Sequence, residues 1–387
     1  MIVEIEAGEY VPKREFTGWN IEDSTYDGCK LTYQDFFENH LIKNLPCIVQ
    51  NVSTTWECSE KWIKNGVIDY EYITQTYGEM EAPVADCCQI LDYAQRTSNM
   101  KISQFMNYMQ NDKKSNLLYL KDLHLKKLRP KDNFYTIPKI FTSDWLNEYA
   151  HDNNEDDFMF VYIGPKNSWT PLHVDVYCSF SWSVNVTGRK KWILFPPGEE
   201  DKLKEKPNQL QLLFDPEKNV DVKHYVIIQE QGDAIFVPSG WYHQVENQLD
   251  TISINHNWNN GCNIKFMWDV LNKSLIDVEH EIEQFKDSPD FSSECQILLK
   301  ALCGANYESF INFISFIAKK RLTQLTGQAH ACNTVSLGAN HVKFDLKMVH
   351  NVMDSISAHP NCKREKKNLL NNSFLLLKQE IVDALKT

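Results

Sequence analysis

The feature that most constrains the fold is a series of short, strand-like segments between residues 158 and 258. The segments are rich in β-branched and aromatic residues, and turn sequences containing Gly or Pro separate them. They are Phe158–Ile163, Ser179–Val186, Lys191–Phe195, His224–Gln229, Asp233–Val237 and Thr251–Asn255. Many short strands with such turns predict a β-barrel or a β-sandwich.

Helical patterns flank this region on both sides. The segments before it are Tyr33–Leu41, Gly66–Tyr77 and Ile102–Gln110, with one strand at Pro46–Val52, and those after it include Asn368–Leu385 and a helix built on Phe310, Phe313, Ile314 and Ile317. We therefore expect an α+β protein with a mixed N-terminal cap (1–115), a barrel (116–262) and a helical C-terminal region (263–387). Thr326–Asn340 is the expected linker.

One helical stripe after Cys262 has two interpretations. Apolar residues alternate at steps of four and three, at Ile264, Trp268, Leu271, Leu275, Val278, Ile282 and Phe285. A stripe of three heptads suits a helix that packs on its own barrel, and it also suits a homodimer seam. We favour packing within the chain and keep a homodimer through the C-terminal helices as the alternative.

Composition excludes several classes of function. The 387 residues include 40 Lys and Arg against 52 Asp and Glu, so a general nucleic-acid surface is not expected, although Lys121–Lys131 and Lys363–Lys367 are locally basic. Eleven cysteines without a C-x-x-C pair favour a reducing compartment, and no apolar run approaches the ~18 residues of a membrane span. We expect a cytoplasmic or nuclear protein. Phosphate-loop, α/β-hydrolase and zincin motifs are absent.

A metal site is the remaining candidate for chemistry. In a strand, His173 and Asp175 would point to the same face about 6–7 Å apart, where both could bind one ion. His243 follows a Pro-Ser-Gly turn and precedes a strand-like run, so a barrel could return it to that face. Two imidazoles and one carboxylate form the facial triad of non-haem Fe(II) oxygenases. A histidine at a turn or in the core is the simpler interpretation of either residue taken alone.

Lys190 adds a cation to this predicted site. It occupies a turn between two strands, after the polar alternation Ser181, Ser183, Asn185, and alternation would turn Lys191 outward if Lys190 points inward. A buried lysine near iron suits 2-oxoglutarate, whose distal carboxylate needs a fixed cation and a hydroxyl. Lys190 is the expected cation, and Thr170 is the expected hydroxyl. A solvent-exposed hairpin lysine is the alternative.

Four motifs together resemble one family. W-T-P-x-H-x-D, S-W-S-V-N-V-x-G-R-K-K-W-x-L-F-P-P, V-P-S-G-W-x-H and D-T-I-S-I-N-H-N-W are similar to those of the jumonji C class of Fe(II)- and 2-oxoglutarate-dependent oxygenases, and most similar to the jumonji C domain-containing protein 4 group. The resemblance implies a double-stranded β-helix, a jelly-roll-like barrel, with His173, Asp175 and His243 as iron ligands. It implies Lys190 and Thr170 as the carboxylate anchor, with Asn255, Asn257, Ser183 and Asn185 as further polar groups of the pocket.

The resemblance also implies an activity. The group is associated with hydroxylation of a lysine carbon in the eukaryotic translation termination factor, using Fe(II), 2-oxoglutarate and O2. A histone methyl-lysine demethylase would use the same iron site, but no cysteine- and histidine-rich reader finger follows Cys262. A catalytically inactive binding module is the other alternative, and it would have no physical reason to keep His173, Asp175, His243 and Lys190. Many relatives also place a tyrosine in the carboxylate pocket, and the sequence does not identify it.

Overall fold

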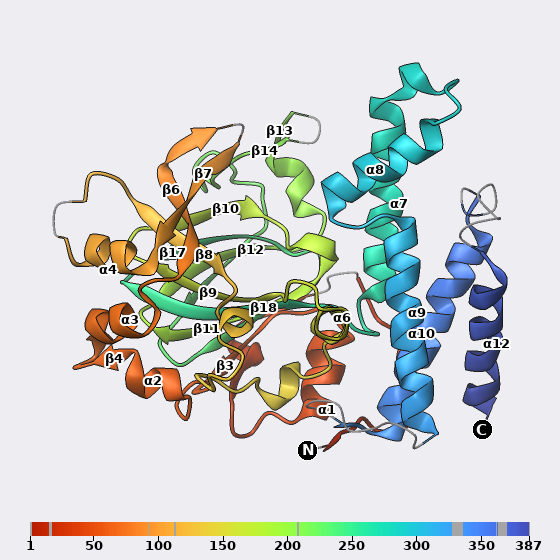
Figure 1. Cartoon of the computed structure of the whole chain (residues 1–387), viewed down its shortest axis with the longest axis horizontal. Helices are drawn as coiled ribbons and strands as arrows, with labels where there is room; N and C mark the ends of the chain where they lie inside the picture. The colour runs from red at the N-terminus through yellow and green to blue at the C-terminus, as the bar shows by residue number, and fades with distance from the viewer. Residues whose placement is uncertain are drawn as a thin grey trace.

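The computed structural model describes residues 2–14, 18–91, 93–111, 114–206, 209–326, 336–360, 362 and 370–386. Two facing sheets form a barrel, with helices at its side (Figure 1). The larger sheet has nine strands within the described residues, in the order β2 (Thr25–Asp27), β3 (Cys47–Gln50), β16 (Ala234–Val237), β11 (Phe180–Thr187), β18 (Thr251–Trp258), β9 (Met159–Gly164), β8 (Leu118–Leu123), β6 (Glu81–Leu91) and β7 (Ala94–Lys101).

The smaller sheet has the order β10 (Trp169–His173), β17 (Tyr242–Asn247), β12 (Lys190–Phe195) and β15 (Tyr225–Gln229). Its strands pair antiparallel. Together the two sheets make the jelly-roll-like core that the sequence predicts, so the α+β barrel with flanking helices is confirmed. The division at 115 and 262 stays a prediction. β2, β3, β6 and β7 come from the predicted cap, yet they extend the barrel's larger sheet.

Alternation along the strands of the larger sheet separates its two faces. In β11, Trp182 and Val184 belong to the apolar core under the helices, whereas Ser183 and Asn185 lie on the opposite face. That opposite face is the barrel interior, because Asn185 Nδ2 donates to the backbone oxygen of Gln229 in the smaller sheet, at 2.9 Å. β11 is thus apolar outside and polar inside, which leaves room for a polar site in this part of the barrel, whereas Ile48, Ile235 and Val237 of the neighbouring strands make the adjoining interior apolar.

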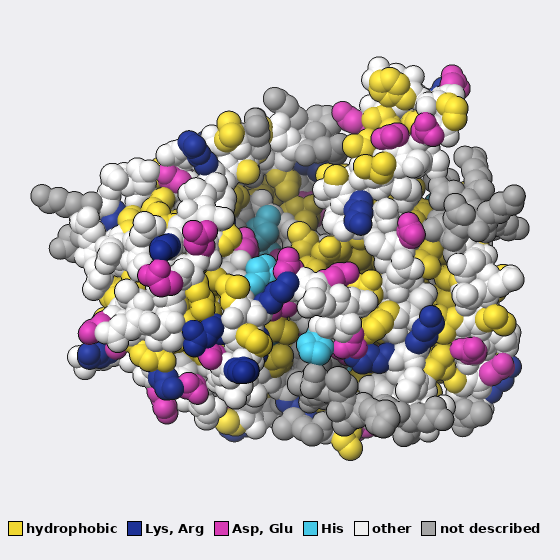
Figure 2. Space-filling model, in the orientation of Figure 1, with side chains coloured by type: hydrophobic (Ala, Val, Ile, Leu, Met, Phe, Trp, Pro, Cys, Tyr) yellow, Lys and Arg dark blue, Asp and Glu magenta, His cyan; other side chains and the backbone are white. Residues whose placement is uncertain are grey.

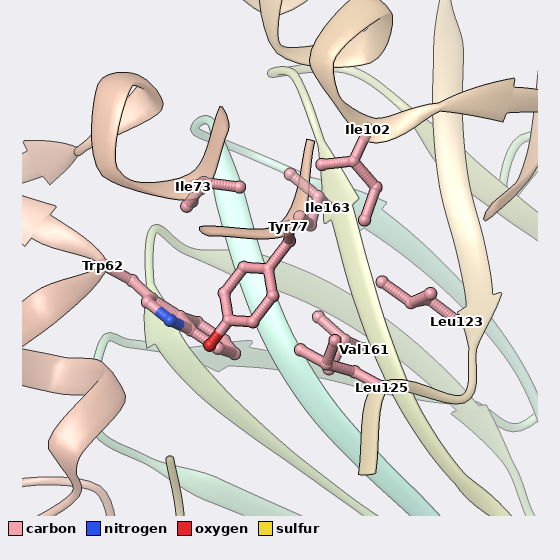
Figure 3. Close-up of a pocket in the computed structure, with 8 residues that line it drawn as sticks. All are labelled: Trp62, Ile73, Tyr77, Ile102, Leu123, Leu125, Val161 and Ile163. Atoms are coloured by element: carbon pink, nitrogen blue, oxygen red, sulfur yellow. The ribbon is translucent and has the colours of Figure 1, made fainter. Parts of the chain in front are cut away.

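Short helices of the N-terminal region cover the outer face of the larger sheet. They are α1 (Tyr33–Phe36), which continues as the π-helix η2 (Phe37–Leu41), α2 (Glu57–Lys61), α3 (Tyr70–Tyr77) and α4 (Ile102–Gln110). Residues 66–69, expected in the α3 helix, instead contain β5 (Val67–Ile68), which pairs with β4 (Ile63–Lys64). Figure 3 shows Ile73, Tyr77 and Ile102 around a small apolar cavity of about 10 Å³, which has room for no more than one water molecule.

The C-terminal region is a group of helices beside the barrel. It comprises α7 (Ile264–Glu281), α8 (Phe291–Cys303), α9 (Tyr307–Leu325), α10 (Ala339–Ala358) and α12 (Asn372–Lys386), and α6 (Trp145–Asn153) contacts it. α8 and the C-terminal end of α7 extend away from the other helices as an arm (Figure 1). Of the predicted helix Asn368–Leu385, residues 368 and 369 lie outside the described residues. Of the predicted linker, residues 327–335 lie outside them as well, and α10 begins where the linker was expected to end.

The apolar stripe of α7 packs within the chain. Trp268, Leu271, Leu275 and Val278 are buried against the same chain, whereas Phe285 beyond the helix is exposed. A homodimer seam through the buried residues would therefore require the helical region to open. Homodimerisation itself stays a prediction.

The remaining elements are short connections. β1 (Ile2–Val3) pairs parallel with β19 (Ser336–Leu337), and β13 (Lys204–Lys206) pairs with β14 (Gln209–Leu210). The other helical turns are η1 (Glu22–Ser24), α5 (Leu125–Leu128), η3 (Lys139–Phe141), η4 (Val176–Cys178), η5 (Glu199–Leu203) and η6 (Glu283–Phe285). Among the described helices, none combines the length and the apolar character that crossing a bilayer requires.

Candidate metal centre and anion pocket

The structure brings His173, Asp175 and His243 together at one end of the barrel interior. His173 ends β10 and lies directly opposite His243 of the antiparallel β17, and the two ring centroids are 4.2 Å apart. Asp175 immediately precedes η4. One ligand atom from each of the three residues lies within 4.8 Å of the other two, and no other group of this kind occurs among the described residues.

Hydrogen bonds orient all three side chains. The Nδ1 of His173 lies 2.8 Å from the backbone oxygen of Pro171, and the Nδ1 of His243 lies 3.1 Å from that of Trp241. When each Nδ1–H donates to its carbonyl, each Nε2 keeps a free lone pair. The Oδ2 of Asp175 accepts a 2.6 Å hydrogen bond from Ser181. Burial, and then the neighbouring His243, lower the pKa of His173 to about 4, so its ring is neutral near pH 7.

This donor set fits Fe(II). Two neutral imidazoles and one carboxylate without a thiolate form a triad that leaves coordination positions open for other ligands. A structural zinc site would be closed by four protein ligands, usually with cysteine among them.

Lys190 supplies a buried cation in the same interior. Its side chain is 2% exposed, and its Nζ donates a 2.6 Å hydrogen bond to Ser253 of the facing sheet. The Nζ also lies 5.8 Å from the ring centroid of Tyr162 and 5.9 Å from that of Trp192. Within the described residues no carboxylate pairs with this ammonium, and burial lowers its pKa to about 7. An anion beside Lys190 would favour its charged form, which fits the distal carboxylate of 2-oxoglutarate.

A β-bulge in β10 places Thr170 and His173 on the same face of the smaller sheet. Thr170 lies opposite Val245 and His173 opposite His243, so three residue steps on β10 match two on β17. In a regular strand, residues three apart point to opposite faces. Because Val245 and His243 share the interior face, the extra residue places Thr170 there too, in line with its predicted role as the hydroxyl.

The remaining predicted residues lie on the interior face but in different surroundings. Asn255 Nδ2 donates to Ser253, the partner of Lys190, and Asn257 Nδ2 donates to Ser179. The hydroxyl of Ser183 is buried with no hydrogen-bond partner among the described residues, so it is free to contact a ligand. The amide of Asn185 binds the backbone of β15, which is a structural role.

Two tyrosines and a lysine near the pocket were not predicted from the sequence. Tyr162 of β9 lies directly opposite Ser253, and Tyr119 of β8 packs edge-on against Tyr162 with centroids 6.0 Å apart. Tyr119 is buried beside Asn247, the residue opposite Lys190. Lys121 Nζ lies 5.8 Å from the Tyr119 ring and donates to Gln95. Strand alternation in the expected Phe158–Ile163 segment could have identified Tyr162, but Tyr119 lies in a strand that was not predicted.

Comparison with known proteins identifies the family. A model of a cupin-like domain matches residues 33–264. Over 367 residues the chain is 41% identical to the 2-oxoglutarate and iron-dependent oxygenase JMJD4 of Gallus gallus, covering 86% of this chain and 85% of that protein. The chain belongs to the cupin-like jumonji C family. Its predicted resemblance to the JMJD4 group is thereby confirmed.

Two further relatives have names that describe reactions on side chains. The arginine-specific demethylase JMJ20 of Arabidopsis thaliana is 36% identical over 316 residues, 75% of this chain and 68% of that protein. The bifunctional arginine demethylase and lysyl-hydroxylase psr-1 of Caenorhabditis elegans is 26% identical over 261 residues, 62% of each chain.

Proposed function

We propose that this jumonji C protein hydroxylates a carbon of a lysine side chain in a protein substrate, with the eukaryotic translation termination factor as the expected substrate. The broader class is that of its relatives, the 2-oxoglutarate and iron-dependent oxygenases, and its cofactors are Fe(II), 2-oxoglutarate and O2. The observation that carries the proposal is that His173, Asp175 and His243 share one barrel interior with the buried Lys190. We expect the reaction to take place in the cytoplasm or the nucleus.

Three residues of the chain would hold the iron for such a reaction, and others would orient them. His173, Asp175 and His243 would hold the iron, which supplies the oxygen activation that side chains cannot perform. Ser181 fixes the Asp175 carboxylate, and the two backbone carbonyls keep each imidazole in the tautomer that binds metal. These contacts set the ligand geometry before any substrate arrives.

The cosubstrate would be held by the other end of the interior. The Lys190 ammonium would pair with the distal carboxylate, and the Thr170 hydroxyl would donate a hydrogen bond to it. Tyr162 and Trp192 line the space around the ammonium and exclude water from it. Exclusion of water strengthens this charge pair, since electrostatic attraction increases in a medium of low dielectric constant.

Arginine N-demethylation is the second candidate function. The name of the Arabidopsis relative favours it, and the same site would then hydroxylate an N-methyl carbon. The name of psr-1 includes both reactions, which supports keeping lysyl hydroxylation as the first candidate. Histone methyl-lysine demethylation, the other enzymatic alternative, is not named for any of the three relatives described above.

Mass spectrometry on a defined substrate separates these functions. Purified termination factor and methyl-arginine peptides would each be incubated with the protein, Fe(II) and 2-oxoglutarate. Lysyl hydroxylation adds one oxygen to a lysine, whereas demethylation removes CH₂ from a methylated residue. Loss of the product in His173→Ala, with retention in a His280→Ala control on the surface of α7, would tie the reaction to the metal centre. An unmodified termination factor together with demethylated peptides would overturn lysyl hydroxylation.

A further inference from the structure

The mouth of the barrel opens into a groove of about 920 Å³ beside α7. The metal-ligand loop lines one wall with Asp175 and Val176, and the other wall consists of α7 between Met267 and Glu281 with Leu302 of α8. Figure 2 shows a hollow in the middle of this face, where histidine and hydrophobic side chains are visible. Because Asp175 belongs to the predicted metal triad, the groove reaches one of the three predicted metal ligands.

The wall that the metal-ligand loop forms is fixed by an unusual backbone. Tyr177 and Cys178, two and three residues after Asp175, both have positive φ, at 58° and 49°. The Tyr177 hydroxyl donates to the backbone oxygen of Gly304 at 3.3 Å, and its ring packs edge-on against Phe158. A Cβ at position 304 would lie only 2.7 Å from that hydroxyl oxygen, so glycine permits the contact. The loop that bears the metal ligand is thus attached to the end of α8.

Apolar side chains are exposed on both walls of the groove. Val176 is 59% exposed directly after Asp175, and Leu302 is 66% exposed two residues before Gly304. Both line the groove. Together they would offer an apolar contact to a partner that entered the groove.

The outer part of the groove carries charge. Lys273, Asp277 and Glu281 follow one another at intervals of four along α7, so they lie on one face of the helix. In the described part of the chain, neither Asp277 nor Glu281 forms an ion pair. Arg14 and Lys204 also line the groove, and Lys204 lies near enough to Asp277 to interact with its charge, but two carboxylates a turn apart that form no ion pair would still accept a basic side chain of a partner.

The dimensions favour an extended chain as the occupant. The stretch of α7 from Met267 to Glu281 is about 21 Å long at 1.5 Å per residue. An extended polypeptide covers that distance with about six residues. A small molecule would occupy only part of it.

We propose that this groove binds the substrate polypeptide in an extended conformation and presents the reacting side chain to the metal centre past Asp175. The polypeptide places an apolar side chain between Val176 and Leu302, and a basic side chain against Asp277 and Glu281. The inference rests on the proposed function, because it assumes that the substrate is a protein.

The test compares substitutions in the groove with one elsewhere. Leu302→Glu removes the apolar contact, and Asp277→Lys with Glu281→Lys reverses the charge, at exposed positions where the fold tolerates polar side chains. Leu376→Glu on α12 is the matched control, since Leu376 is 64% exposed and lies outside the groove. With the termination factor as probe, we expect KM to rise at least tenfold in both groove variants. We expect kcat, 2-oxoglutarate affinity and the mass in solution to stay unchanged, and Leu376→Glu to match the wild type.

Each outcome decides the proposal. An unchanged KM in both groove variants, or an equal rise in Leu376→Glu, would overturn the groove as the substrate site while hydroxylation of the factor still stood. Failure of the proposed function would appear in the wild type, as an unmodified factor, and methyl-arginine peptides would then be the probe in the same comparison. If those peptides do not stimulate 2-oxoglutarate turnover either, the groove is not a polypeptide site.

Discussion

Replacing Lys190 by methionine should make the protein more stable in the absence of 2-oxoglutarate. A pKa that burial lowers from 10.5 to about 7 makes the charged form roughly 4–5 kcal/mol less favourable in the folded protein than in the unfolded chain. Methionine has a similar length without the charge, and it forfeits the hydrogen bond to Ser253, about 1 kcal/mol. We therefore expect the free energy of unfolding to increase by about 3 kcal/mol at pH 7.

The pH dependence gives this prediction a distinctive signature. Between pH 7 and 10.5 the unfolded chain binds more protons at Lys190 than the folded protein does, so wild-type stability rises with pH through this window. The advantage of Lys190→Met should fade over the same window and vanish near pH 10. Saturating 2-oxoglutarate with Mn²⁺ should stabilise the wild type and not the variant, since ligand that binds only the folded state adds about 2.7 kcal/mol at one hundred times its Kd.

Urea denaturation followed by tryptophan fluorescence at pH 7, 8.5 and 10 measures these differences. Lys191→Met is the matched control. Lys191 is the next residue in the chain, but its side chain is half-buried and lies on the outer face of the barrel. A Lys190→Met protein that is less stable than the wild type at every pH would refute the reasoning. So would equal stabilisation of both proteins by 2-oxoglutarate.

Three further changes test the site and the fold. His243→Ala should weaken Mn²⁺ binding more than about a hundredfold by calorimetry, and the same loss in the surface variant His280→Ala would contradict this role. Thr170→Val keeps the shape of the side chain and should lower 2-oxoglutarate affinity about tenfold, with metal affinity unchanged. An unchanged 2-oxoglutarate affinity would exclude a role for the Thr170 hydroxyl in binding the carboxylate. Arg321→Met should lower the free energy of unfolding by roughly 3–5 kcal/mol, because it leaves Glu148 and Asp345 without the buried arginine. Urea denaturation measures this loss. A smaller loss would mean that other groups stabilise the two carboxylates.

The predictable part of the site came from residues close together in sequence. His173 and Asp175 belong to one short segment, and alternation across the β11–β12 hairpin indicated which lysine faces inward. Tyr119 could not be placed in the same way, because its position beside Tyr162 depends on the pairing of β8 with β9. Such pairing joins distant segments and leaves no local pattern.

The predictable part of the fold followed the same principle. Strands with clear alternation, such as β11 and β18, were identified, whereas β10 contains Pro171 and a bulge, and β6 has an irregular register with β7. α10 was not predicted, although its buried residues Val342, Leu346, Val349 and Met353 have helical spacing. This spacing could have predicted the helix from the sequence.

The bulge in β10 places a limit on how this protein can diverge. Deleting one residue between Thr170 and His173 would restore regular pairing and keep both side chains inside the barrel. Losing the bulge at constant length would instead turn Thr170 to the outside of the barrel while His173 stayed opposite His243. The metal would still find its ligands, and the cosubstrate would lose its hydroxyl. In this segment a spacing of three residues needs the bulge and a spacing of two does not, so spacing and pairing together are a sharper marker of a working enzyme than either residue alone.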